Sequence, residues 1–193
     1  MKIGVLALQG DFAEHIHVLD QLGVETLEIR LPGQLDDLDG LIIPGGESTT
    51  IGKLCVDYAL LEPLKKFGRK HAIWGTCAGA ILLSRDASRS QPLLNLMDIR
   101  VARNAFGRQV SSFEADLDIE PLKKVTKTTE TYHAFFIRAP IITSVEGSAR
   151  VLAVLPDGRI VAAFQGKLLA TSFHPELTAD TRFHQYFLSL AKN

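Results

Sequence analysis

The first half of the chain alternates short, continuous apolar runs with segments in which apolar residues recur at helical spacing. Residues 2–8 are apolar, end in turn-forming residues and are expected to be a buried strand; further strands are expected at residues 24–31, 39–44 and 72–74. Between them we expect one helix that Asp11 caps and Gly23 ends, and a second from about Thr49 to Gly68. Strands that alternate with helices predict a parallel sheet with right-handed connections.

The second half has a different pattern, because after Ser84 short apolar runs follow one another with little helix between them. Further strands are expected at residues 98–101, 110–116, 135–138, 151–155, 160–165 and 168–173. Residues 156–158 (Pro-Asp-Gly) predict a hairpin turn, and the polar residues 123–130 predict a solvated loop. A closing helix is expected over residues 178–192, with these side chains facing inward: Phe183, Tyr186, Phe187 and Leu190. We therefore expect a single α/β domain over residues 1–193.

The composition is that of an ordinary globular protein, and it narrows the range of partners. Of the 193 residues, 46% are hydrophobic, and 21 Lys and Arg stand against 22 Asp and Glu. This near balance of charge argues against a protein that coats nucleic acid or an anionic membrane. No apolar run approaches the roughly eighteen residues of a membrane span, and residues 3–8 are too short a run for a signal peptide. Two cysteines without a CxxC motif fit a reducing compartment, so we expect a cytoplasmic protein.

The strongest local signal is the sequence Gly-Thr-Cys-Ala-Gly at residues 75–79, directly after a predicted strand. A reactive residue between small residues in a strand-to-helix turn is typical of a nucleophile elbow. The amino terminus of the helix that follows favours a thiolate over a thiol. The alternative is a buried structural cysteine, which suits Cys55 inside an amphipathic helix better than Cys77. We therefore expect Cys77 to be a nucleophile.

A cysteine nucleophile needs a base, and His174 has the most suitable surroundings. It follows the apolar run 168–173 and precedes Pro175, which favours an extended conformation for His174. Residues two apart in an extended chain face the same side, so Glu176 can reach the ring and fix its tautomer. This arrangement of nucleophile, base and orienting acid is that of hydrolytic triads.

The other histidines are expected to serve packing or to lie at the surface. His15 and His17 stand two positions apart on a predicted helix and point to different sides, which argues against a metal pair. His71 and His184 are expected at the surface or in packing, and His133 has no obvious partner. We expect no metal site.

A third motif, Pro-Gly-Gly-Glu-Ser at residues 44–48, also follows a predicted strand. A Gly-Gly step can turn its amide N–H groups into an open site, which suits an oxyanion hole. A phosphate-binding loop is the alternative, but the chain contains neither GxxxxGK[ST] nor GxGxxG. Because the carboxyl ends of parallel strands share one edge of a sheet, the three motifs together point to acyl transfer by a cysteine.

The three motifs together, with HPE at 174–176, resemble those of the class I glutamine amidotransferases, whose triad is Cys-His-Glu. Further stretches resemble the family of glutaminase subunits of pyridoxal 5'-phosphate synthase: IGVLALQG at 3–10, PGGESTT at 44–50, RNAFGRQVSSFEADL at 103–117 and FIRAP at 136–140. This resemblance runs nearly end to end. It implies a three-layer α/β sandwich around a mixed, largely parallel sheet.

The resemblance also implies a division of labour between two proteins. This subunit would hydrolyse L-glutamine to L-glutamate and ammonia, and the ammonia would pass to a separate barrel-fold synthase subunit in a hetero-oligomer. By the same match, Cys77 would be the nucleophile, His174 the general base and acid, and Glu176 its orienter. The glutamine site would be lined by Gly46, Glu47, Ser48, Arg103, Ile137 and Arg138. No cofactor is implied for this subunit.

Guanidinium groups are natural partners for the α-carboxylate of glutamine, which supports Arg103 and Arg138 on chemical grounds. A surface ion pair is the alternative for both arginines. The candidates for the oxyanion hole and its activation are Gly45, Gly46, Ala78 and Gln9. Because glycine permits either orientation of the Gly45–Gly46 amide, a partner that docks near Gln9 could switch the site on.

Other functions stay open at this point. A glutaminase subunit that feeds a different synthase would carry the same triad, and it is the nearest alternative. A cysteine hydrolase of related fold would have no reason for the HPE segment, and a catalytically silent interaction subunit would tolerate loss of Cys77.

Overall fold

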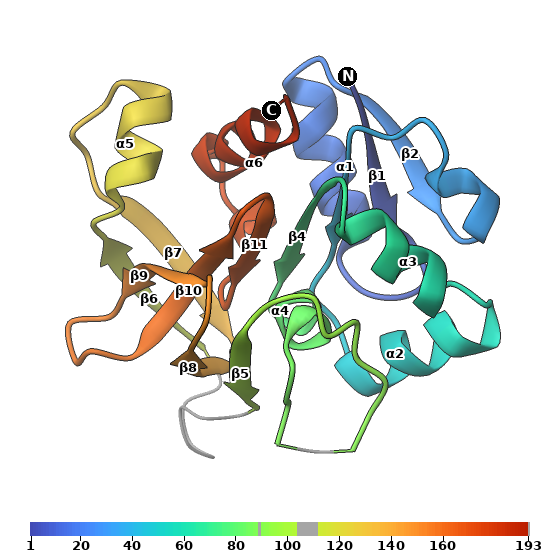
Figure 1. Ribbon diagram of the computed structural model, residues 1–193. Helices are drawn as coiled ribbons and strands as arrows, with labels where there is room; N and C mark the ends of the chain where they lie inside the picture. Colours follow the sequence, from blue (N-terminus) through green and yellow to red (C-terminus); the bar gives the residue numbers. More distant parts are fainter. Residues whose placement is uncertain (89, 104–111, 193) are drawn as a thin grey trace.

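The structure is a computed structural model that describes residues 1–88, 90–103 and 112–192 (Figure 1). Within this part of the chain, one sheet has the strand order β2-β1-β3-β4-β11-β10-β8-β5, and β9 pairs with β10. Its strands are β1 (Lys2–Leu6), β2 (Glu25–Ile29), β3 (Gly40–Ile43), β4 (Ala72–Thr76), β5 (Ile99–Ala102), β8 (Ile141–Val145), β9 (Arg150–Val154), β10 (Ile160–Gln165) and β11 (Leu168–Thr171). A separate antiparallel hairpin consists of β6 (Ser112–Leu117) and β7 (Tyr132–Ile137).

The sheet is parallel on one side and antiparallel on the other. Strands β2, β1, β3, β4 and β11 run parallel to one another, which confirms the expectation for the first half of the chain. The remaining strands pair antiparallel, and β9 and β10 form the hairpin predicted at residues 156–158. Strand β8 was not expected from the sequence, because its five residues directly follow Pro140 and include two polar side chains.

Helices cover both faces of the sheet, as Figure 1 shows. One core lies between the sheet and α2 (Ser48–Asp57), α3 (Leu61–Gly68) and α4 (Ala78–Leu83). The other core includes side chains of α1 (Phe12–Gln21), α5 (Glu120–Thr126), α6 (Arg182–Lys192) and the β6–β7 hairpin. Adjacent strand residues divide between the cores, for example Leu41 and Ile42. The expected three-layer arrangement is therefore confirmed.

The single helix expected from Thr49 to Gly68 is wrong, because two helices occupy this stretch. Helix α2 ends at Asp57, and Ala59 takes a positive φ of 55° before α3 begins at Leu61. Pro63 explains the break, since a continuous helix would place its ring against the carbonyl of residue 59 and leave that carbonyl without a donor.

The polar segment 123–130 is not simply a loop. Residues Glu120–Thr126 form α5, whose first turn contains a proline and whose Leu122 is buried in the core. The helix ends where Lys127 takes the left-handed conformation. The closing helix α6 begins at Arg182 rather than at residue 178, and its expected inward residues Phe183 and Phe187 are fully buried. In the described part of the chain, no helix combines the length and hydrophobicity that a bilayer span requires.

Candidate active site

The candidate site lies at the carboxyl ends of four neighbouring parallel strands. These strands are β1, β3, β4 and β11, and each is followed by one of the segments singled out in the sequence. Gln9 follows β1, Gly45 follows β3, Cys77 follows β4 and His174 follows β11. The parallel pairing brings these ends to one edge of the sheet, as the sequence predicts.

Cys77 occupies a strained turn between β4 and α4. Its backbone has φ 46° and ψ −99°, and its N–H donates to the Thr171 carbonyl at 2.8 Å. Such a positive φ is unusual for a residue with a side chain. The flanking glycines are required sterically, because a Cβ on Gly75 would lie 2.3 Å from the Gly79 carbonyl carbon and one on Gly79 would lie 2.0 Å from the Ile43 carbonyl oxygen. The elbow geometry therefore follows the sequence prediction.

The candidate base and its orienting acid are in direct contact. His174 Nδ1 lies 2.7 Å from Glu176 Oε1, and both residues are buried. The expected route to this contact was wrong, because Pro175–Leu177 form a short 3-10 turn rather than extended chain. The His174 N–H donates to the Phe135 carbonyl of β7 at 2.9 Å, which anchors the turn to the hairpin.

The electrostatics of the pair favour a charged imidazole. Burial lowers the pKa of His174, but hydrogen bonds to Cys77 and Glu176 and the charges of both groups outweigh it and raise the pKa well above its ordinary range. Burial raises the pKa of Glu176, while the hydrogen bond with His174 opposes that rise. A protonated His174 beside Cys77 stabilises a thiolate. Cys55 differs, since burial raises the pKa of its thiol to about 12 and it packs in the core.

The Gly-Gly segment packs directly against the candidate base and against the turn after β1. A Cβ on Gly45 would lie 2.6 Å from His174 Cε1, so only glycine fits there. The Gly45 carbonyl accepts a hydrogen bond from the Asp11 N–H at 3.2 Å, and the Gln9 side-chain oxygen accepts one from the Glu47 N–H at 2.8 Å. The turn after β1 therefore bonds to the Gly45–Gly46 peptide and to the Gly46–Glu47 peptide that follows it.

Several candidate glutamine-binding residues form one polar cluster. Arg103 Nη2 donates to Glu47 Oε1 at 2.7 Å, and Ser48 Oγ donates to Gln91 Oε1 at 3.2 Å. Burial raises the pKa of Glu47, but hydrogen bonds from Thr49 and Arg103 and the charge of Arg103 together outweigh it and lower that pKa. Arg103 therefore makes an ion pair, which was the alternative to a role in binding glutamine. Its partner, however, is Glu47, which is itself a candidate glutamine-binding residue.

Ile137 and Arg138 stand apart from this cluster. They lie at the end of β7 and are both exposed, and Arg138 has a φ of 45°. Among the described residues, no hydrogen bond or ion pair joins either of them to the segment 44–49 or to Arg103. Ala78 is buried in the first turn of α4, next to Cys77. Part of the 103–117 motif, residues 104–111, lies outside the described residues.

Sequence reasoning missed Asp11 as a neighbour of the candidate base. Asp11 does stand at the N-cap of α1, but its side chain makes no capping hydrogen bond. Its Oδ2 lies instead 3.5 Å from His174 Nδ1. Asp11, His174 and Glu176 bring ligand atoms within 4.8 Å of one another. A metal ion there would have to displace the hydrogen bond between His174 and Glu176, so the absence of a metal stays a prediction.

The histidine assignments need one correction. His133 does have partners, since its ring nitrogens lie 2.7 Å from Asp116 Oδ1 and 2.9 Å from Glu114 Oε2 on the neighbouring strand. These bonds raise the pKa of the exposed His133 imidazole. A β6–β7 hairpin in the right register was the signal that could have revealed them, because Asp116 pairs directly with His133.

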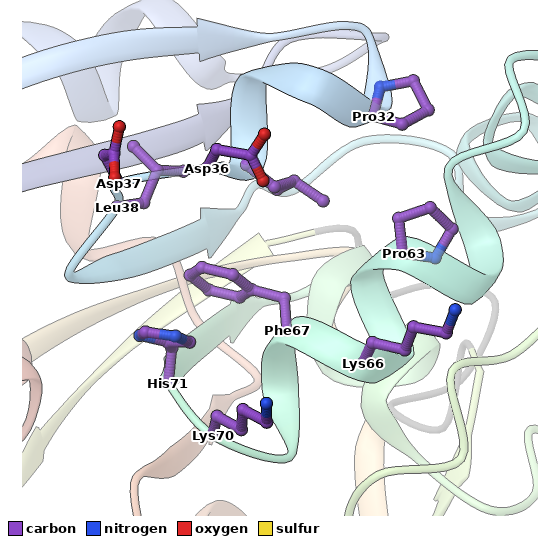
Figure 2. A pocket seen from close by; sticks show the side chains of 10 residues that line it. Pro32, Asp36, Asp37, Leu38, Pro63, Lys66, Phe67, Lys70 and His71 are labelled. Carbon is purple, nitrogen blue, oxygen red and sulfur yellow. The ribbon is translucent and has the colours of Figure 1, made fainter.

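A cavity of about 660 Å³ lies between the 3-10 turn Pro32–Leu35 and α3 (Figure 2). His71 stacks on Phe67 at its floor, with ring centroids 4.6 Å apart, in keeping with the packing role expected for this histidine. Asp36 and Lys66 come from its two opposite walls. The cavity borders the segments that precede β3 and β4, at the edge of the sheet away from Cys77, and its lining contains no cysteine, serine or threonine.

Comparison with known proteins agrees with this geometry. Residues 5–192 match the model of the SNO glutamine amidotransferase family. Two curated relatives, from Herpetosiphon aurantiacus and Moorella thermoacetica, are each 56% identical to the chain and are named pyridoxal 5'-phosphate synthase subunit PdxT. The first alignment covers 98% of this chain and 100% of the relative, and the second covers 98% and 99%. A solved structure described as a glutamine amidotransferase has a TM-score of 0.91 and 48% identity, with 99% of each chain covered.

Proposed function

Since the chain belongs to the SNO glutamine amidotransferase family, we propose that it hydrolyses L-glutamine to L-glutamate and ammonia and delivers the ammonia to a synthase subunit that makes pyridoxal 5'-phosphate. In this proposal Cys77 is the nucleophile, His174 the general acid and base, and Glu176 the residue that orients and charges His174. L-Glutamine is the substrate, and no cofactor or metal takes part.

The observation that carries the proposal is the contact of His174 with Glu176 at the same edge of the sheet as the Cys77 elbow. The 2.7 Å hydrogen bond fixes the ring so that Nδ1 faces the carboxylate, which leaves Nε2 for the reacting groups. The raised pKa of His174 supports an imidazolium beside a thiolate in the resting site. Both features are needed for attack on an amide by sulfur.

The reaction follows from these groups in two stages. The Cys77 thiolate attacks the side-chain amide carbon of glutamine, and the tetrahedral intermediate collapses as His174 gives its proton to the departing nitrogen. Ammonia leaves, and a thioester joins Cys77 to the glutamyl group. Water then attacks the thioester while His174 accepts its proton, which releases glutamate and restores the imidazolium–thiolate pair.

The α-carboxylate of glutamine requires a positively charged partner and its α-ammonium group requires a negatively charged one. The polar cluster contains side chains of both charges. Arg103 keeps further guanidinium donors beside the one bonded to Glu47, and these suit the α-carboxylate of glutamine. The exposed carboxylate of Glu47 suits the α-ammonium group. Gly46, Ser48, Ile137 and Arg138 are assigned to the same pocket by their place in the family motifs.

The ammonia acceptor is proposed from the printed names of the relatives, which are subunits of pyridoxal 5'-phosphate synthase. A barrel-fold synthase subunit would bind this chain in a hetero-oligomer and receive the ammonia. A location in the cytoplasm fits a catalytic thiol that must stay reduced, and both Cys55 and Cys77 are free.

The turn after β1 supports a role for that partner in activation. Gln9 and Asp11 both form hydrogen bonds to the segment that contains Gly45 and Gly46. A partner that binds this turn and displaces it would therefore also displace the candidate oxyanion hole. The N–H groups of Gly46 and Ala78 are the proposed oxyanion donors. A single donor of this kind is worth about 10²–10³ in turnover, enough for a switch.

Substitution of the two cysteines tests the proposal. Cys77→Ala should abolish glutamate release in the presence of the synthase subunit, with a loss of at least about 10³-fold, because triad members act as a unit. Cys55→Ala removes a buried thiol that lies in the core and should keep turnover close to that of the unsubstituted chain. Glutamate release by Cys77→Ala at near the parental rate would refute the proposed nucleophile.

A further inference from the structure

Two histidines are completely buried behind the candidate triad, where α1 and α6 pack side by side (Figure 1). His15 of α1 and His184 of α6 both pack edge-on against the Trp74 ring. His15 Nδ1 lies 3.0 Å from His184 Nε2, and His15 Nε2 lies 3.2 Å from Thr76 Oγ1. The same His15 Nε2 is 3.4 Å from Oε2 of Glu176. The buried network therefore reaches the carboxylate of the triad.

The two oxygens of Glu176 have unequal surroundings. Oε1 bonds to His174 Nδ1 at 2.7 Å, whereas Oε2 is fully buried and has no well-aligned hydrogen bond among the described residues. A buried carboxylate oxygen without a donor is strongly unfavourable. His15 Nε2, at 3.4 Å, is a ring nitrogen that can supply this donor after a small movement.

Both buried rings are neutral. Burial, together with the charges of His184 and His174, lowers the pKa of His15 well below its ordinary value. Burial alone lowers the pKa of His184 to about 3. A neutral imidazole has one N–H and one lone pair, so the 3.0 Å contact between the rings needs a donor on one and a lone pair on the other.

Either His15 or His184 can be the donor in this contact, but only one of the two assignments gives every N–H of the two rings an acceptor. If His15 donates from Nδ1, its Nε2 lone pair faces the Glu176 carboxylate, and the remaining His184 proton sits on Nδ1. That Nδ1 is buried and has no hydrogen-bond partner among the described residues. If His184 donates from Nε2 instead, His15 carries its proton on Nε2, where it faces Thr76 Oγ1 and Glu176 Oε2. The second arrangement leaves no buried donor without an acceptor in the two rings.

We propose that His15 is a positioning residue of this site: its Nε2–H is shared between Thr76 and Glu176 and holds the Glu176 carboxylate in the orientation and charge that support His174. The inference rests on the proposed function, because it assigns a residue behind the same triad. His15 touches neither the substrate nor the thiol in this assignment. It acts through Glu176.

The expected signature is a change in pH dependence, because a donor to the carboxylate favours its ionised form. The titratable groups that face Glu176 are His174 in its own segment, Asp11 in the turn after β1, His15 in α1 and Tyr132 in β7. All but His15 stay in place when His15 alone is substituted. Loss of the His15 donor therefore raises the pKa of Glu176, and activity on the acid side is lost at a higher pH.

The test compares two substitutions that differ by one methylene. The amide of His15→Gln reaches about as far as Nε2 and can still donate to Glu176, whereas the amide of His15→Asn ends near the position of Nδ1. We expect His15→Asn to shift the acid limb of kcat/KM for glutamine upward by about one pH unit and to lower kcat about tenfold at neutral pH. KM should change less than twofold, and His15→Gln should restore most of the activity. His17→Asn, on the exposed side of the same helix, is the control.

The same assay separates failure of this inference from failure of the proposed function. If the unsubstituted chain releases glutamate by a Cys77-dependent route but His15→Asn and His15→Gln have the same pH profile, the positioning role is overturned. If no Cys77-dependent release is found, the proposed function itself is refuted, and the inference with it. A measurement that needs no variant is the tautomer of His15, read from nitrogen and proton shifts of the ring in the unsubstituted protein. A proton on Nε2 is expected, and a proton on Nδ1 would overturn the assignment.

Discussion

Glu176 is the residue whose chemistry depends most on its surroundings. Its side chain is withdrawn from solvent, and its Oε1 bonds to the His174 ring, which carries charge in the proposed mechanism. A buried carboxylate of this kind stabilises an imidazolium far more than an exposed one does, because water does not screen the pair. The proposed role of Glu176 is therefore electrostatic as well as orienting.

Glu176→Gln separates these two contributions. The substitution keeps the shape and an acceptor for His174 Nδ1 but removes the negative charge, so the imidazolium loses its partner. We expect kcat for glutamate release to fall at least about 100-fold, with KM for glutamine changed less than threefold. Steady-state kinetics in the presence of the synthase subunit measure both constants. A rise in KM with an unchanged kcat would make Glu176 a substrate contact instead.

The residues of the candidate site could be predicted from the sequence where a short motif determines the local backbone geometry. Cys77 stands between glycines that only a tight elbow requires, and Glu176 follows His174 at a spacing that a single turn can close. Asp11 and His15 could not be predicted in the same way. Their contacts with His174 and Glu176 join segments more than 160 residues apart and depend on the packing of α1 beside the end of β11.

At the scale of elements, the elbow depends on close approach between a helix and two strands. Gly75 of β4 contacts the backbone of Gly79 in α4, and Gly79 in turn contacts the backbone of Ile43 in β3. Neither neighbour is a flexible side-chain end, so an added methyl group cannot be accommodated locally. The position of Cys77 is thus set by backbone contacts on both sides of the turn.

Gly79→Ala should therefore destabilise the whole domain. We expect a loss of at least about 2 kcal/mol in the free energy of unfolding, since overpacking against rigid backbone typically costs 1–3 kcal/mol. Urea unfolding followed by circular dichroism measures the loss. Gly33→Ala is the matched control, because beyond its chain neighbours no described atom lies within 4 Å of the added Cβ and the φ of Gly33 is not positive. It should be neutral or slightly stabilising. Equal stabilities for the two variants would contradict this account of the elbow.

The elements of the first half could be predicted because β1, β3 and β4 are buried, largely apolar runs, and β2 alternates polar and apolar residues. The break between α2 and α3 and the helix α5 were predicted wrongly because their local sequence patterns are weaker. A proline such as Pro63 is found in the first turn of a helix and also where a helix is interrupted. The break at Ala59 can therefore be predicted only by considering the clash between the Pro63 ring and the preceding helical turn. Helix α5 buries only Leu122 in the core, and such a helix is stabilised by tertiary packing rather than by its own pattern.

At the scale of the whole molecule, the parallel half of the sheet collects four chain segments at one edge. The turn after β1 contributes Gln9 and Asp11, and it bonds to the Gly-Gly segment after β3. Glutamine hydrolysis without an acceptor for the ammonia would waste substrate. An active site whose oxyanion hole forms only when a partner binds this turn avoids that loss.

We therefore expect the isolated chain to be a poor glutaminase. Addition of the synthase subunit should raise kcat for glutamate release about 10²-fold or more, the value of one oxyanion-hole donor. Gln9→Ala removes the acceptor of the Glu47 N–H and should weaken this response. Equal rates with and without the partner would contradict the switch. A full response by Gln9→Ala would exclude Gln9 from it.

The central claim is that nitrogen from the amide of glutamine passes through this subunit to pyridoxal 5'-phosphate. The most direct measurement supplies [amide-15N]glutamine to the complex with the synthase subunit and its sugar phosphate substrates, together with excess unlabelled ammonium. Mass spectrometry then gives the 15N content of the pyridoxal 5'-phosphate formed. With the unsubstituted chain, the product should carry 15N despite the unlabelled ammonium; with Cys77→Ala it should form from ammonium and carry none. Unlabelled product from the unsubstituted complex, or labelled product from the Cys77→Ala complex, would contradict the claim.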